Sequence, residues 1–228
     1  MSLSYTVPSS LEYFACLVQS DEHFPLLEAA ASIAQDEYPE LDVQQLLGDV
    51  DQMQARIRRR LASDAPSLQR LHMLNQFFYS DLGFAGNVNN YYDPDNSYLN
   101  AVLRTRRGIP ISLAVLWMEL APGLGLHVRG VGFPGHFLVK FDSDKYKIFI
   151  DCFNGGALLT EKNCARFLTE AGYGFEDRFL QKSPARAILA RMIKNLLATY
   201  NKLDEPLKKP RLPRFIEILG CEQREEGL

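Results

Sequence analysis

Cysteine is scarce in this chain and is not arranged for disulfides or zinc. The 228 residues contain four cysteines, far apart in sequence and without a C-x-x-C pair: Cys16, Cys152, Cys164 and Cys221. Disulfide-rich folds and structural zinc sites need closely spaced cysteines. We therefore expect free thiols in a reducing cytoplasm, with no metal and no other cofactor.

A basic surplus and long apolar runs are also missing. Lys and Arg number 25 against 28 Asp and Glu, for a formal net charge of -3, whereas general nucleic-acid binders normally carry a basic excess. No apolar run approaches the roughly 18 residues of a membrane span, and residues 1–7 lack the basic and apolar regions of a signal peptide. We expect a cytoplasmic protein whose partners are neither nucleic acids nor membranes.

Hydrophobic residues are abundant, at 46% of the chain, which is enough for a sizeable core. Helical spacing of apolar residues dominates residues 1–80 and returns in 181–228, while the segment between them carries strand patterns. The sequence predicts an α+β fold in one compact unit. Its parts are an N-terminal helical layer (1–80), a core (81–180) and a C-terminal helical tail (181–228).

Residues 104–156 organise the rest of the chain. A helix begins at the segment 108–112 and continues to about Leu124, with apolar residues on almost all sides, so it is expected to be buried. Three strands follow, at 127–133, 136–141 and 146–151. This pattern predicts a central buried helix packed on a small antiparallel sheet.

A hairpin brings a histidine opposite an aspartate. If residues 142–145 form its loop, Phe141 faces Tyr146, and the constant index sum of 287 then pairs His136 with Asp151. A carboxylate beside an imidazole fixes its tautomer and raises its basicity, as in a catalytic triad. A structural hydrogen bond at a sheet edge would look the same in sequence.

Residues 83–96 are rich in Gly, Asn, Asp and Tyr, which is typical of a loop. The loop is long for a compact domain, so we expect it to form a wall of the site. Tyr91 or Tyr92 should border His136, where an amphipathic ring can both pack and hydrogen-bond. Asn96 or Ser97 should cap the helix that follows.

Taken together, these residues resemble the transglutaminase-like superfamily within the papain-like cysteine fold, and in particular its SirB-type bacterial branch. The resemblance covers roughly residues 26–172 and, more weakly, the helix to Tyr200. It rests on separated blocks in order: NYYDP (90–94) with NSYLN (96–100), RGIPISL (107–113), GVGFPGHF (130–137), and ID (150–151) with FNGG (153–156).

The resemblance implies a papain-like core with His136 and Asp151 at the positions of the catalytic His and Asp. A gapless count from Gly108 places Pro110 where active relatives have the nucleophilic Cys. Proline supplies neither a thiol nor the backbone N–H that helps hold an oxyanion. Ser112 lies about 200° further round the helix and either caps its start or replaces the nucleophile. Cys152 is either a core residue or an unusual nucleophile.

The leading expectation is a transglutaminase-like protein without its catalytic Cys, a binding or regulatory module that uses the remnant cleft. Tyr91, Tyr92 and Ser112 would contact a peptide, a protein or a small anionic ligand there. The alternative is a hydrolase or acyltransferase with Ser112 or Cys152 as nucleophile and His136 as base. A third reading is a purely structural scaffold. The neighbouring Arg104, Arg106 and Arg107 are candidates for contacting an anion.

Overall fold

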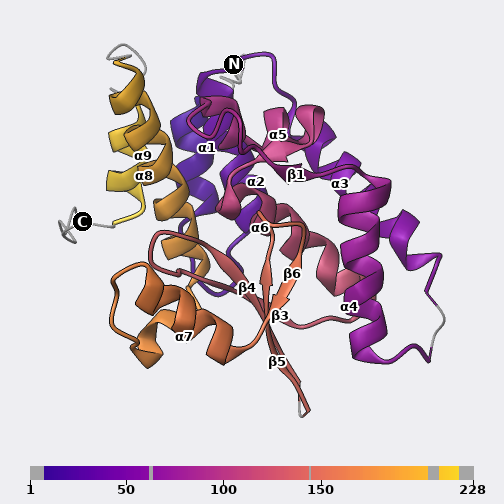
Figure 1. The fold of residues 1–228 in the computed structure, drawn as a ribbon. Coiled ribbons are helices and arrows are strands. Elements are labelled where there is room, and N and C mark those ends of the chain that lie inside the picture. Colours follow the sequence, from indigo (N-terminus) through magenta and orange to yellow (C-terminus); the bar gives the residue numbers. More distant parts are fainter. Residues whose placement is uncertain (1–7, 62–63, 144, 205–210, 221–228) are drawn as a thin grey trace, which may run out of the picture.

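The computed structural model describes residues 8–61, 64–143, 145–204 and 211–220 (Figure 1). Its α-helices are α1 Ser10–Leu17, α2 Leu26–Ser32, α3 Val43–Arg58, α4 Ser67–Asn75, α5 Leu99–Thr105, α6 Pro110–Leu120, α7 Glu161–Glu170, α8 Ala185–Leu203 and α9 Leu212–Ile218. The shorter helical turns are η1 Ile33–Asp36, η2 Gln76–Asp81, η3 Pro94–Asn96, η4 Ala121–Leu124 and η5 Asp177–Leu180. Among the described residues, none of the helices is long and apolar enough to cross a membrane.

Several helices begin where the sequence indicates. The side chains of Ser9, Asp42 and Thr160 accept hydrogen bonds from the first turns of α1, α3 and α7. Such caps satisfy backbone N–H groups that have no partner inside the helix. The helical parts of the prediction therefore rest on local chemistry that the chain supplies.

The central helix is α6, which runs through the middle of the molecule (Figure 1). Nine of its residues are buried, including Trp117, which is completely inaccessible. Helices α3 and α4 lie on one side of α6, and α8 and α9 lie on the other (Figure 1). The main hydrophobic cluster extends from Phe14 in α1 to Leu219 just after α9. A mixed helix and sheet architecture with a buried central helix, as expected, is present.

The antiparallel sheet contains one strand more than the sequence predicts. Its order is β3 (Val128–Val131), β4 (Leu138–Asp142), β5 (Lys147–Asp151) and β6 (Ala157–Leu159). The sequence analysis treated the residues of β6 only as part of a connection. This strand is three residues long and half exposed, so its pattern is too short to show a period of two.

The predicted hairpin register is wrong by two residues. Ser143 and Tyr146 exchange backbone hydrogen bonds of 2.9 and 3.3 Å, so they close the turn, and β4 pairs with β5 at an index sum of 289. The turn is tighter than the four-residue loop that was assumed. A shift of two preserves the face on which each side chain lies. His136 and Asp151 therefore stay on one face, as diagonal instead of direct neighbours.

His136 also lies outside the strand in which it was expected. Strand β4 begins at Leu138, and the backbone N–H of His136 donates to the carbonyl of Phe133 at 3.0 Å. Gly135 has a φ of +65°, a conformation that a glycine adopts without strain. The Pro134-Gly135 sequence thus forms a turn that presents His136 at the end of the strand.

A two-strand parallel pair connects the tyrosine-rich loop to the start of α6. Strand β1 (Ala85–Gly86) pairs with β2 (Arg107–Gly108), and the N–H of Asn87 donates to the carbonyl of Gly108. Neither strand was predicted, because two residues carry no periodicity. This pair places the beginning of the loop beside the first turn of the central helix.

Asn75 joins the central helix to the turn that follows Asp151. Its side-chain oxygen accepts from the indole N–H of Trp117 at 3.0 Å, and its side-chain NH₂ donates to the carbonyl of Gly156 at 2.8 Å. A buried indole N–H without a partner is costly. Asn75 thus supports both the core and the chain segment that carries the aspartate.

We predict that Asn75→Ala lowers the free energy of unfolding by about 2 kcal/mol, because both the indole N–H and the Gly156 carbonyl lose their partner. Urea unfolding followed by tryptophan fluorescence measures the change, since Trp117 is the single tryptophan. Gln45→Ala is the matched control, because it removes an exposed amide that bonds Asp49. Equal losses in the two variants would contradict this role of Asn75.

Candidate functional site

The candidate site is centred on His136 and Asp151. The Nε2 of His136 lies 2.9 Å from Oδ1 of Asp151. The side chain of His136 is 14% exposed and that of Asp151 is 8% exposed. The structure therefore brings the two predicted residues into hydrogen-bonding contact, with the histidine nearer the solvent.

The turn after β5 holds the Asp151 carboxylate in place. Oδ1 also accepts from the backbone N–H groups of Phe153 and Asn154 at 3.1 and 3.2 Å, and Oδ2 accepts from Nδ2 of Asn154 at 2.8 Å. Burial alone would raise the pKa of Asp151, but the interactions with His136 and Asn154 outweigh it and lower the pKa. Asp151 is therefore ionised at neutral pH, and both of its oxygens only accept hydrogen bonds.

Two aromatic rings flank the imidazole of His136. Phe153 meets it edge-on with a centroid distance of 6.3 Å, and Phe167 of α7 lies nearly parallel to it at 6.2 Å. Tyr91 contacts Phe153 at 5.7 Å and is 38% exposed, while Phe167 is 50% exposed. We call Tyr91, Phe153 and Phe167 the aromatic rim. Tyr91 and Phe167 are exposed and Phe153 is partly buried, so the surroundings of His136 are apolar but accessible.

Of the two predicted tyrosines, the loop directs only Tyr91 toward the histidine. Tyr91 is separated from His136 by Phe153. Tyr92 instead stacks against the ammonium group of Lys202 in α8, 3.2 Å from its ring centroid. The loop therefore reaches the candidate site at one position and α8 at the next.

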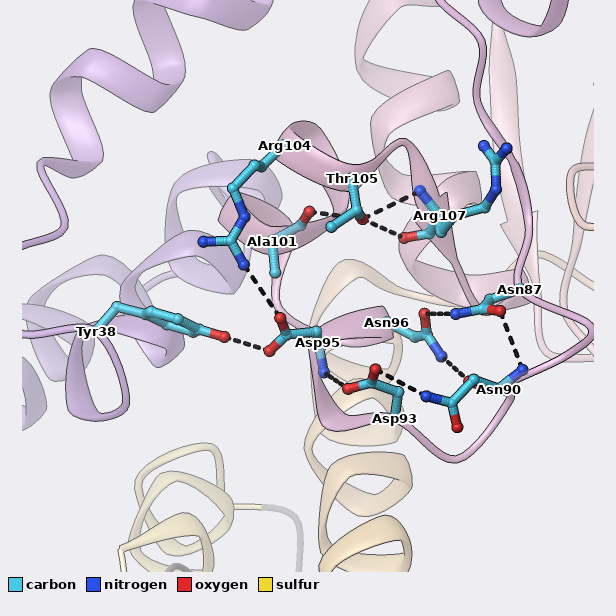
Figure 2. Close-up of polar contacts among 10 residues, drawn as sticks. All are labelled: Tyr38, Asn87, Asn90, Asp93, Asp95, Asn96, Ala101, Arg104, Thr105 and Arg107. Atoms are coloured by element: carbon cyan, nitrogen blue, oxygen red, sulfur yellow. Dashed lines mark hydrogen bonds and ion pairs between the residues drawn. The ribbon is translucent and has the colours of Figure 1, made fainter.

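The tyrosine loop (residues 87–98) is organised by the side chain of Asn96, which is only 2% exposed (Figure 2). Its Nδ2 donates to the carbonyls of Asn90 and Tyr91 at 2.7 and 3.1 Å, and its Oδ1 accepts from Asn87 at 2.9 Å. Asn96 is thus not a helix cap, as the sequence analysis expected, and neither is Ser97. The N-cap of α5 is Tyr98, which forms no side-chain cap.

The first turn of α6 carries Pro110 and Ser112, and both are buried. The Ser112 hydroxyl donates to the carbonyl of Asn96 at 2.6 Å and accepts from the backbone N–H of Ile109 at 3.1 Å. Ser112 therefore fastens the helix start to the loop, which is the capping role that the sequence left as one of two readings. Its oxygen is fully inaccessible and is not placed to contact a ligand.

The helix start and the histidine–aspartate pair are linked through Gly86 and Phe153. Gly86 pairs with Gly108, and a Cβ added at Gly86 would lie 2.6 Å from both the ring and the carbonyl of Phe153. Only a glycine permits this approach. Because Phe153 also contacts His136, the pair and the start of α6 belong to one continuous set of contacts.

Two of the three arginines expected to contact an anion have other partners. Arg104 forms an exposed ion pair with Asp95, which also accepts a hydrogen bond from Tyr38 (Figure 2). Arg107 donates to the carbonyl of Gly83. Arg106 adopts a left-handed φ of 59°, and its guanidinium lies over the ring of Phe84. Through these contacts the three arginines stabilise the loop and the C-terminal end of α5.

The described cysteines differ in burial, and neither of the two near Asp151 has an accessible thiol. Cys152 is completely buried in the main core, and burial raises the pKa of its thiol far above the ordinary range. Cys164 is also buried and Cys16 is exposed, while Cys221 lies outside the described residues. In the described part of the chain, no group of three or more His, Cys, Asp and Glu side chains could hold a metal ion.

Comparison with known proteins identifies the superfamily of the chain. A family model of the transglutaminase-like superfamily matches residues 44–194, from the start of α3 to the middle of α8. The chain belongs to this superfamily.

Relatives of the chain include proteins from bacteria and animals. A UPF0162 protein from Xylella fastidiosa strain Temecula1 is 37% identical over 190 residues, which cover 81% of this chain and 68% of that protein. Human F-box only protein 21 is 31% identical over 219 residues, covering 81% of this chain and 34% of that protein. The chain thus spans about two thirds of the bacterial relative and one third of the human one. No solved structure matches.

Sequence reasoning missed three side chains of the site. Asn154 was noted only within the FNGG block, although its amide bonds Asp151. Phe153 was noted in the same block without a role, and Phe167 was not singled out. The approach of Phe167 to His136 depends on how α7 packs on the sheet, and no local signal reports that packing. An Asx pattern after Asp151 could have indicated the role of Asn154.

We predict that the stability contributed by Asp151 depends on pH. Its folded-state pKa is lowered from the unfolded value near 3.9, so ionised Asp151 stabilises the fold above that value, and the contribution is lost as pH falls through the folded pKa. Asp151→Asn should lower the free energy of unfolding at pH 7, and the gap from wild type should narrow below about pH 4. Asp49→Asn, at an exposed position in α3, is the control in urea unfolding at each pH. A gap that stays constant with pH would contradict this account.

We also predict that neutral His136 carries its proton on Nε2. An ionised carboxylate accepts but cannot donate, so the nitrogen that faces Asp151 must be the donor. Nitrogen-15 NMR of labelled protein distinguishes the two tautomers, with exposed His127 as the reference ring. Signals of an Nδ1-protonated ring at His136 would overturn the assignment.

Proposed function

We propose that this protein is a non-catalytic binding module of the transglutaminase-like superfamily, within its SirB-type bacterial branch. The single observation that carries the proposal is Pro110 at the first position of α6. The resemblance places the nucleophilic Cys at this position, and proline has neither a thiol nor a backbone N–H. The similarity to the Xylella UPF0162 proteins supports a bacterial branch.

In this proposal the ancestral histidine–aspartate pair contributes to binding. With Nε2 donating to Asp151, Nδ1 of His136 is left as an acceptor for an N–H group of a ligand. The aromatic rim supplies apolar contact around it, which suits the side chains and amide groups of a peptide. The bound ligand is therefore a peptide or a protein segment that enters the remnant cleft over His136.

The alternative, a hydrolase with a non-standard nucleophile, is opposed by two observations. The Ser112 hydroxyl is fully buried and hydrogen-bonds to the backbone on both sides. Cys152 has no accessible surface, and burial raises its pKa, so the thiolate needed for attack is disfavoured. Neither side chain has the exposure that a nucleophile requires.

We predict that the wild-type protein has no thiol-dependent transglutaminase or protease activity. The assay combines amine-donor and peptide substrates with and without iodoacetamide. Because the position that needs a thiol holds Pro110, the product should stay at the background level in both arms. Turnover that alkylation abolishes would show that a native cysteine reacts, and would overturn the proposal.

A restored thiol tests the position itself. In Pro110→Cys, a cysteine facing His136 should react with iodoacetamide about tenfold faster than the same cysteine in the matched control Pro110→Cys/His136→Gln, since one unit of pKa changes the thiolate fraction tenfold. Both variants place the thiol at the same buried position, so a difference in rate reports the histidine and not the accessibility of the thiol. Mass spectrometry assigns each alkylated site, which separates this thiol from exposed Cys16. If adding His136→Gln leaves the Pro110→Cys rate unchanged, then Pro110 does not face the histidine.

A further inference from the structure

Helix α8 carries only positive charges. Its residues Ala185–Leu203 include two arginines and two lysines, Arg186, Arg191, Lys194 and Lys202, and no Asp or Glu. Arg186 is engaged elsewhere, because its guanidinium donates to Asp21 and to the carbonyls of Val18 and Leu219. The other three cations remain to be explained.

Arg191 lies against the segment that leads into His136. Its Nη2 donates to the carbonyl of Phe133 at 3.0 Å, and its guanidinium lies over the ring of Phe137, 5.8 Å from the centroid. These two residues stand on either side of the turn that presents His136. These contacts hold the Arg191 side chain of α8 beside the turn that carries His136.

The positive charge of Arg191 is not balanced by a carboxylate. In the described ranges, no Asp or Glu forms an ion pair with it. Burial lowers the pKa of Arg191, and its charge also acts on the hydroxyl of Tyr91 in the aromatic rim. A partly buried guanidinium without a counterion favours binding of an anionic group.

Lys194 and Lys202 extend this charge along the same face of α8. At about 100° per residue, positions 191, 194 and 202 lie within about 80° of arc. We call them the basic stripe. Both lysines are exposed, and Lys202 lies over the ring of Tyr92, which is 48% exposed. The tyrosine loop thus contacts the stripe at Tyr92, and Tyr91 lies within the electrostatic influence of Arg191.

The acidic groups of the adjoining loop and turn are already occupied. Asp93 accepts from the side chain of Asn90 and from the N–H of Asp95, and Asp95 is paired with Arg104. Asp151 is paired with His136. The surface between the stripe and the aromatic rim therefore combines exposed aromatic rings with cations that form no ion pair with a carboxylate among the described residues.

We propose that the basic stripe binds an acidic peptide segment whose carboxylate contacts Arg191 while the adjoining residues lie over the aromatic rim. This inference rests on the proposed binding function and names its ligand class. With a rise of about 1.5 Å per residue, Arg191 and Lys202 lie about 16 Å apart along α8. An extended segment of about five residues spans that length. Carboxylates on alternate residues of the peptide would contact the cations of the basic stripe. The aromatic rings of the loop would contact the peptide residues between them.

The test measures fluorescence anisotropy of a labelled peptide of about five residues rich in Glu, compared with the same peptide carrying Gln in place of Glu. The acidic peptide should bind, and its affinity should fall as salt is raised, whereas the Gln peptide should bind at least tenfold more weakly. Lys202→Gln, an exposed change, should weaken binding about threefold, which is the scale of one exposed charge pair. Arg191→Gln should weaken it about tenfold or more, because a charge-assisted hydrogen bond is lost.

Arg58→Gln is the matched control, since it removes one exposed charge from α3 on the far side of α6 (Figure 1). Unchanged binding in this variant, with loss in Lys202→Gln, supports the stripe. Circular dichroism checks that Arg191→Gln is folded. If this variant is unfolded, the binding comparison is made with Lys202→Gln. Equal binding of the acidic and Gln peptides, or an equal loss in Arg58→Gln, would overturn the inference.

NMR shifts of the His136 ring separate failure of this inference from failure of the proposed function. If the Gln peptide moves those signals and the acidic peptide does not, the binding function stands and the acidic ligand class is wrong. If the protein turns over acyl substrates, the proposed function itself fails, whatever the peptide preference.

Discussion

The side-chain amide of Asn96 is the constraint on which the candidate site depends. It is buried and bonds three residues of the tyrosine loop, while its backbone carbonyl accepts from Ser112 and Ile109 at the start of α6. A loop has no periodic hydrogen bonds of its own, so its backbone groups need partners of this kind. One residue thereby gives the loop a defined shape and attaches it to the central helix. The placement of Tyr91 beside Phe153 and of Tyr92 beside Lys202 follows from that attachment.

A continuous series of contacts connects the start of α6 to His136. Gly86 pairs with Gly108 at the helix start and lies against Phe153, which follows Asp151 by two residues and flanks His136. Asn75 holds the same turn from the other side through Gly156 and Trp117. Packed chains of this kind transmit a displacement at one end to the other, because protein interiors contain little free volume. Substitutions in the loop are therefore expected to reach His136 through packing.

The sequence predicted the parts of the structure that depend on local chemistry or on the alternation of side chains between the two faces of a strand. The caps at Ser9, Asp42 and Thr160 are local, and the contact between His136 and Asp151 survived a register error because a shift of two keeps both side chains on one face. The turn between Ser143 and Tyr146 could not be fixed from composition, since two-residue and four-residue loops fit the same letters.

Strands of two or three residues carry no period, which is why β1, β2 and β6 were missed. Asn96 was misassigned because an asparagine before a helix suits a cap and a loop equally well. The proximity of Arg191 and Phe167 arises from helix packing over long sequence separations.

The histidine–aspartate pair has a physical explanation that is independent of catalysis. A carboxylate that is 8% exposed would be costly without partners, and removing His136 would leave Asp151 with a lost charge-assisted hydrogen bond in a poorly solvated place. A contribution to stability therefore suffices to explain the pair, so the pair by itself does not argue for chemistry. What stability does not explain is the surrounding surface. Exposed aromatic rings lose apolar burial, and Arg191, which has no carboxylate partner in the described part of the chain, bears an uncompensated desolvation cost. Both features become favourable when a ligand covers the rings and supplies the missing negative charge. The uncompensated surface around the pair is thus the stronger argument for binding.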